Sequence, residues 1–156
     1  MKTKKKLIEV LKTDMRLIMP GKVQILNVVQ KRISDTKLRI LAPGTILVFV
    51  FDTDVGDPSI LIENIKKAKM SSNIKDVYCV PQVKNLEEEL VRAIGERDIK
   101  KLLNSKSQKD FKRDMNRERN LKSKLESLHF DIHKLWTKNP GTPFDVITNS
   151  SKKIKL

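Results

Sequence analysis

Residues 45–52, with the sequence TILVFVFD, form the segment that most constrains the fold of this chain. The seven residues before the aspartate are almost uniformly apolar and do not alternate with polar residues. A half-exposed strand would show such alternation, whereas a strand covered on both faces does not need it. We therefore predict a buried strand here, of the kind found in parallel sheets with helices on both faces.

The segments around this strand alternate between helical and strand patterns. Apolar residues at helical spacing predict helices, and apolar runs rich in β-branched residues predict strands. Strands that alternate with helices indicate right-handed crossovers and a small doubly wound, mostly parallel sheet of the α/β class. The predicted helices are residues 4–18, 34–41 and 59–70 and the helix that Asn85 caps and Gly95 ends, and the predicted strands are 22–30, 45–52 and 76–81.

The last third of the chain has a different character. Residues 98–128 are strongly charged and thinly apolar at helical spacing, and residues 144–147 predict a short edge strand. The sequence contains no internal repeat and no long linker. We therefore predict a single domain, with an α/β core at residues 1–95 and a helical, basic C-terminal extension at residues 96–156 packed on it.

The overall charge favours a polyanionic partner. The chain carries 33 Lys and Arg against 19 Asp and Glu, a net charge of +14. Binding of basic residues to phosphates releases counterions, so nucleic acid is the partner we expect, while a lysine surface that serves solubility is the alternative. The single Cys79, the absence of a signal-peptide core and the lack of any apolar run near the roughly 20 residues of a membrane span predict a cytoplasmic protein without membrane association.

Acidic residues gather where the predicted central strand ends. Asp52 ends the strand, Asp54 follows two residues later, and Asp57 stands in the loop at residues 53–58. Ligands of open α/β sheets bind at the carboxyl ends of the strands, and neighbouring carboxylates are stabilised there by a hard cation such as Mg²⁺. The alternative is turn formation, in which Asp57 holds the start of the following helix.

The helix after Asn85 offers further carboxylates near the end of the next strand. On a helical projection Glu87 falls within the apolar arc, and Glu89 flanks it. We predict Glu87, and second Glu89, as additional metal ligands. The alternative is that these residues only complement the positive end of the helix dipole.

A strongly basic stretch supplies the third element of the predicted site. Residues 106–124 contain eight basic and three acidic residues. A basic face beside a metal would neutralise the charge of a phosphate group, whereas the alternative is a solvated helix with ion pairs along it. The predicted nucleic-acid contacts are Lys106, Lys109, Lys112 and Arg113.

The strand with Asp52 and Asp54 at its tip, followed by VPQVKNLEEEL at residues 80–90, resembles a TOPRIM-type domain. This is the fold of topoisomerases, primases and OLD-like or RloB-like defence nucleases, and the resemblance covers about residues 5–95. It implies a nucleic-acid-processing protein of nuclease type that uses Mg²⁺ or Mn²⁺, with a role in mobile elements or phage defence.

One departure from the TOPRIM pattern bears on catalysis. Such domains usually open with a strand that ends in a Glu, whereas here the nearby Glu9 lies inside a predicted helix. Two alternatives to a nuclease therefore stand. One is a catalytically degenerate module that binds nucleic acid or a protein partner supplying the missing function. The other is a metal-dependent phosphotransferase that acts on a small substrate.

Overall fold

A computed structural model describes residues 2–54 and 56–156, so Val55 of the predicted loop lies outside the described residues. The chain forms two compact units, each built from segments that are distant in sequence. We call them the β unit and the helical unit. The β unit comprises Leu26–Asn85 and Lys138–Lys153, and the helical unit comprises Met1–Ile25, Leu86–Thr137 and Ile154–Leu156.

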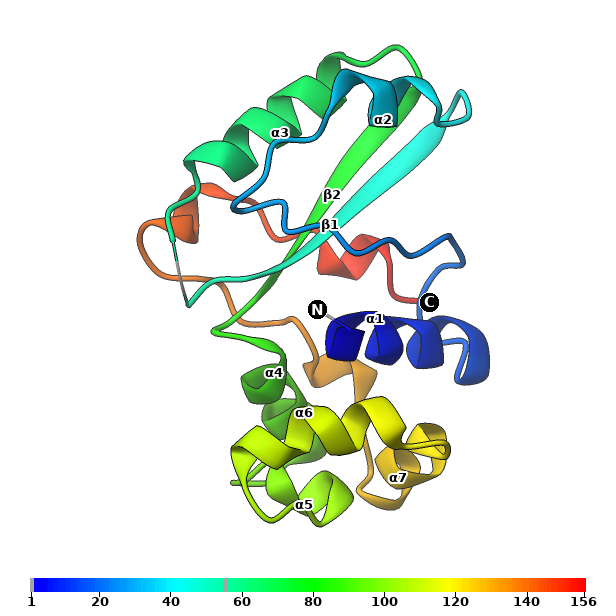
Figure 1. The fold of residues 1–156 in the computed structure, drawn as a ribbon, viewed down its shortest axis with the longest axis vertical. Helices are drawn as coiled ribbons and strands as arrows, with labels where there is room; N and C mark the ends of the chain where they lie inside the picture. Colours follow the sequence, from blue (N-terminus) through cyan, green and yellow to red (C-terminus); the bar gives the residue numbers. More distant parts are fainter. Residues whose placement is uncertain (1, 55) are drawn as a thin grey trace. The chain divides into compact units, whose positions relative to one another are not determined.

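The β unit is built on two parallel strands. β1 (Thr45–Asp52) pairs along its length with β2 (Ile74–Gln82), and Phe49 lies opposite Cys79. α3 (Ser59–Met70) connects the two strands and packs against β2 (Figure 1). The strands predicted at residues 45–52 and 76–81 are confirmed, and both belong to an α/β arrangement. The burial predicted for both faces of residues 45–52 is wrong, because only Phe49 and Phe51 of β1 are buried and its other residues are half-buried.

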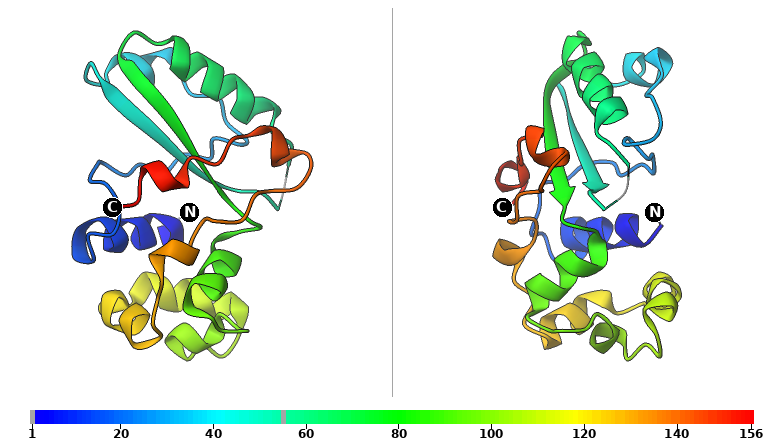
Figure 2. Two further views of the ribbon diagram at one scale, coloured as in Figure 1. Left: turned by 180° about the vertical axis from the view of Figure 1, so that it is seen from behind. Right: turned by 90° about the vertical axis from the view of Figure 1, so that its left-hand side faces the viewer.

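Short helices complete the β unit. Figure 2 shows α2 (Asp35–Arg39) on one side of the strands, and η3 (Phe144–Val146) and η4 (Ser151–Lys153) on the other. The core draws on all of these elements except η4. Its buried residues are Val28, Val29, Ile33, Leu38, Phe49, Phe51, Leu61, Ala68, Val77, Cys79, Phe144 and Ile147.

Two predicted strands are wrong. Residues 22–30 form no strand, because the Asn27 side chain accepts hydrogen bonds from the N–H groups of Val29 and Gln30 and folds the backbone into a turn. Residues 144–147 form a 3₁₀ turn, whose three-residue spacing brings both Phe144 and Ile147 into the core. Within the described residues the sheet therefore has two strands, fewer than a doubly wound sheet requires.

The helical unit contains no strand pair beyond a single bridge between Ile18 and Lys155 within its described residues. Each of its helices buries at least one apolar residue, and the helical prediction for residues 98–128 is confirmed. The helix predicted at residues 4–18 begins earlier and ends at Asp14. The elements are α1 (Lys2–Glu9), the π-helical η1 (Val10–Asp14), α4 (Leu86–Ile94), α5 (Lys100–Leu103), α6 (Gln108–Arg117), α7 (Leu121–Ser127) and the 3₁₀ turn η2 (Ile132–Lys134).

None of the helices among the described residues combines the length and the apolar character that crossing a membrane demands.

Candidate nucleic-acid interface and strand-end carboxylates

The two parallel strands end at the same edge of the sheet and are tied together there. Asp52 lies opposite Gln82 in the strand register. The backbone N–H of Thr53 donates to the carbonyl oxygens of Gln82 (3.2 Å) and Lys84 (2.8 Å), and the Thr53 hydroxyl donates to the Gln82 carbonyl (3.0 Å). Thr53, which follows β1, is therefore hydrogen-bonded to Gln82 at the end of β2 and to Lys84 just after it.

This edge brings Asp54 together with Asn85. The Asn85 Nδ2 donates a hydrogen bond of 3.2 Å to the Oδ2 of Asp54, which is exposed. Asp52, two residues before Asp54, is half-buried. Asn85 was expected only as a helix cap, so its contact with Asp54 is a feature that local sequence did not indicate. The β unit thus presents two carboxylates and an amide at the carboxyl ends of its strands, where parallel sheets bind ligands.

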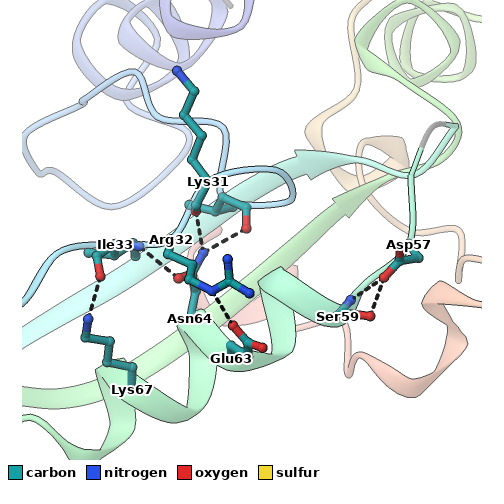
Figure 3. A network of polar contacts seen from close by, with 9 residues as sticks. Lys31, Arg32, Ile33, Asp57, Ser59, Glu63, Asn64 and Lys67 are labelled. Carbon is teal, nitrogen blue, oxygen red and sulfur yellow. Dashed lines mark hydrogen bonds and ion pairs between the residues drawn. The ribbon is translucent and has the colours of Figure 1, made fainter.

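Asp57 serves the start of α3. Its Oδ1 accepts hydrogen bonds from the Ser59 N–H (2.9 Å) and from the Ser59 hydroxyl (Figure 3). These bonds lower the pKa of the Asp57 carboxyl below its ordinary value of 3.8. The turn-forming alternative therefore accounts for Asp57.

The strand-end donors match Mg²⁺ in type. Carboxylate and amide oxygens are the ligands that this cation prefers. Among the described residues, however, no three His, Cys, Asp or Glu side chains converge to hold a metal ion. Asp52 and Asp54 belong to the β unit, whereas Glu87 and Glu89 belong to the helical unit. The metal site therefore stays a prediction.

The structure reverses the predicted burial of the two glutamates on α4. Glu89 is fully buried, and its Oε1 accepts a hydrogen bond of 3.0 Å from the backbone N–H of Trp136. Its Oε2 pairs with the Arg92 guanidinium at 3.0 Å. Glu89 is buried because both of its oxygens find partners inside the helical unit, so it has a structural role. Glu87 is only half-buried and lies 4.0 Å from the Lys112 ammonium.

The exposed face of α6 is basic. Phe111 and Met115 of this helix are fully buried and define its inner side. The six exposed residues include four basic side chains and no acidic one. They are Gln108, Lys109, Lys112, Arg113, Asn116 and Arg117. Lys106, which precedes the helix, is also exposed.

The two aspartates of α6 lie at the margin of this face. Asp110 and Asp114 are half-buried, and the Arg113 guanidinium approaches them at 3.4 and 3.6 Å. Asp114 also accepts a hydrogen bond of 2.7 Å from the Ser105 hydroxyl. The ion-pair alternative therefore holds for Arg113, while Lys109 and Arg117 appear in no ion pair that the described residues show.

α1, which contacts α6, carries further lysines. The Thr3 hydroxyl donates to the Asn116 Oδ1 (3.3 Å), and the Lys6 ammonium donates to the backbone carbonyl of Glu118. Figures 1 and 2 show the two helices side by side within the helical unit. The basic run at residues 2–6 was visible in the sequence, but its position depends on a contact between segments more than 100 residues apart.

We call the solvent-facing cations of these two neighbouring helices the α1–α6 basic cluster. Lys2 is exposed, and Lys5 stands on the helical face opposite the buried Thr3 and Leu7. The cluster consists of Lys2, Lys5, Lys109, Lys112, Arg113 and Arg117.

Comparisons with known proteins give no further assignment: no protein-family model matches the chain, and no match was found among curated proteins or among solved structures.

Proposed function

We propose that this protein binds nucleic acid through the α1–α6 basic cluster. The observation that carries the proposal is the composition of the exposed face of α6, where four of six side chains are basic and none is acidic. A face that served only solubility would be expected to mix charges of both signs. The helical unit as a whole has 21 Lys and Arg against 12 Asp and Glu, a net charge of +9.

The spacing of these cations suits a phosphate backbone. Lys109, Lys112 and Arg113 stand at helical positions three and four apart, which place their side chains on one face. Lysine contributes a mobile point charge, whereas the arginine guanidinium can hold a phosphate with two parallel hydrogen bonds. To do so, Arg113 would give up its contacts with Asp110 and Asp114, so its net contribution is smaller than that of an unpaired arginine.

The test compares two triple variants that lose the same charge. In Lys109→Gln/Lys112→Gln/Arg113→Gln the cluster loses three cations, and in Lys66→Gln/Lys75→Gln/Lys152→Gln three exposed lysines of the β unit are lost. We expect the cluster variant to bind labelled DNA about 10- to 100-fold more weakly in fluorescence anisotropy, and the control variant to change affinity by less than about threefold. An equal loss in both variants would show that net charge alone drives binding and would refute the cluster.

A second candidate function is metal-dependent hydrolysis of phosphodiesters, as in the TOPRIM-like nucleases that the sequence resembles. The aligned ends of β1 and β2 and the contact between Asn85 and Asp54 favour it. Asp52 and Asp54 would hold Mg²⁺, which when bound supplies an activated water as the nucleophile. The basic cluster would then retain the nucleic acid.

Cleavage assays separate the two functions. Plasmid DNA is incubated with Mg²⁺ or Mn²⁺ and with wild type, Asp52→Asn/Asp54→Asn, or the control Asp76→Asn/Asp145→Asn, which removes two exposed carboxylates of the β unit. Cleavage by wild type and control but not by Asp52→Asn/Asp54→Asn supports the nuclease. Equal cleavage by all three refutes the metal assignment. If calorimetry detects no binding of Mg²⁺ while the protein still binds DNA, the protein is a binding module without catalysis.

A further inference from the structure

None of the seven aromatic side chains of this protein, all of which lie among the described residues, is exposed. Phe111 is the only aromatic residue on α1 or α6, and it is fully buried beneath the basic face. Trp136 is also fully buried, and Phe130 is half-buried beyond the end of α7. In the β unit, Tyr78 is half-buried and the Lys153 ammonium lies 5.1 Å from the centre of its ring.

The lack of exposed rings bears on which form of nucleic acid the cluster can hold. Proteins that bind single strands combine a basic groove with aromatic rings on which successive bases stack, and each stacked base contributes about 1–3 kcal/mol. The α1–α6 basic cluster provides the charge without the rings. A flexible single strand would therefore lose conformational entropy on this surface without gaining the stacking that normally offsets the loss.

Binding to a duplex requires cations but no exposed aromatic rings, and the cluster provides such cations. Its backbone is already ordered and carries one negative charge per roughly 1.7 Å of axis, so cations held on a rigid scaffold suffice. α6 has 10 residues and is therefore about 15 Å long, and the buried Phe111 and Met115 on its other side anchor the helix that carries these basic residues.

If the cations of the exposed face contact phosphates, few other groups on it remain to read a base sequence. Its amide side chains are Gln108 and Asn116, and the Asn116 Oδ1 already accepts a hydrogen bond from Thr3. Lysines and arginines that contact phosphate fix the orientation of a protein on a duplex but carry no sequence information.

From these observations we infer that the α1–α6 basic cluster binds double-stranded nucleic acid through its phosphates, in preference to single strands and without selecting a sequence. The inference rests on the proposed nucleic-acid binding and specifies the substrate class of that same surface.

The experiment measures three ligands by fluorescence anisotropy at one salt concentration: a DNA duplex of roughly 20 base pairs, one of its strands alone, and an unrelated duplex of equal length. We expect the wild type to bind the duplex about tenfold more tightly than the strand and to bind the two duplexes with affinities within about threefold. The Lys109→Gln/Lys112→Gln/Arg113→Gln variant is expected to lose most of the duplex binding.

The outcomes distinguish this inference from the proposed function. Equal or tighter binding of the single strand, lost in the same triple variant, would overturn the duplex preference and leave nucleic-acid binding intact. Binding of neither form would refute the proposed function itself. A difference of more than about tenfold between the two duplexes would show sequence readout. Phe130→Leu is a further check, because a loss of strand affinity in this variant would reveal a stacking site and contradict the inference.

Discussion

At the scale of single residues, Glu89 shows how the helical unit accommodates a buried charge. Its side chain is fully buried, whereas that of its partner Arg92 is 28% exposed, so water can reach the guanidinium when the carboxylate is removed. We predict that Glu89→Ala lowers the free energy of unfolding by about 1–3 kcal/mol, chiefly because the buried Trp136 N–H loses the Glu89 acceptor. Urea unfolding followed by the fluorescence of Trp136, the only tryptophan, measures the effect.

The matched control for this prediction is Glu126→Ala. Glu126 pairs with Lys122 at the surface of α7, so its loss is expected to change stability by less than about 0.5 kcal/mol. An unfolding midpoint of Glu89→Ala equal to that of Glu126→Ala would contradict the structural role of Glu89.

Cys79 gives a prediction that depends on pH. Burial raises the pKa of its thiol from 9.0 to about 11, against a small opposing effect of Lys69. Between pH 9.0 and about 11 the thiol therefore keeps its proton in the folded protein, whereas it is ionised in the unfolded protein. The contribution of Cys79 to the free energy of unfolding is thus fully present below pH 9.0 and is lost as the pH rises toward about 11.

Thiol labelling tests this assignment. Because the Cys79 thiol is buried and its pKa is raised, the folded protein should react with Ellman's reagent much more slowly than the protein in urea. Between pH 9.0 and about 11, wild type should lose stability more steeply than Cys79→Ala. Rapid labelling of the folded protein would show that the thiol is accessible and ionised.

At the level of secondary-structure elements, the side chain of Asn64 on α3 forms hydrogen bonds with the irregular segment at residues 28–33. This buried side chain accepts a hydrogen bond from the Ile33 N–H and donates to the carbonyl oxygens of Val28 and Lys31, each at 2.9 Å (Figure 3). We predict that Asn64→Ala destabilises the protein by about 3 kcal/mol, because three backbone groups lose their partner. The neighbouring Glu63→Ala, which removes only an exposed pair with Arg32, should cost less than about 1 kcal/mol.

Thermal unfolding monitored by circular dichroism compares these two variants. A melting temperature of Asn64→Ala no lower than that of Glu63→Ala would show that water replaces the Asn64 hydrogen bonds without cost. The segment at residues 28–33 would then be held by its apolar side chains alone.

The start of α6 is fixed by Ser107. Its side-chain oxygen accepts a hydrogen bond of 3.1 Å from the Asp110 N–H. We predict that Ser107→Ala costs about 1 kcal/mol of stability in urea unfolding, whereas Ser107→Thr, which keeps the hydroxyl, costs less than about half of that. Equal losses in the two variants would indicate that packing around Ser107, and not the hydrogen bond, stabilises the start of the helix.

At the scale of the whole molecule, the charge predicts how binding responds to salt. If the four basic residues of α6 each neutralise one phosphate, the logarithm of the binding constant should fall with the logarithm of the salt concentration with a slope of about −3.6. The Lys109→Gln/Lys112→Gln/Arg113→Gln variant should reduce the magnitude of this slope by about 2.7, and the Lys66→Gln/Lys75→Gln/Lys152→Gln variant should leave it unchanged. A slope that is the same in all three proteins would place the phosphate contacts elsewhere.

Elements whose signal is local could be predicted from the sequence alone. The apolar run at residues 45–52 predicted a strand, although only Phe49 and Phe51 of β1 are buried, and helical patterns predicted α3, α4 and the helices after residue 98. These patterns suffice because backbone conformation and side-chain direction within one element repeat over a few residues.

Features that depend on partners distant in sequence followed from the packing of the folded chain. Residues 22–30 have a strand-like composition, but the turn at Asn27 and the bonds to Asn64 give their backbone other partners. Glu89 is buried where the backbone N–H of Trp136 meets it, and α1 contacts α6 through Thr3 and Asn116. In these contacts the partners of Glu89, Asn64 and Thr3 lie more than 30 residues away in sequence, so local patterns, which repeat over a few residues, could not identify them.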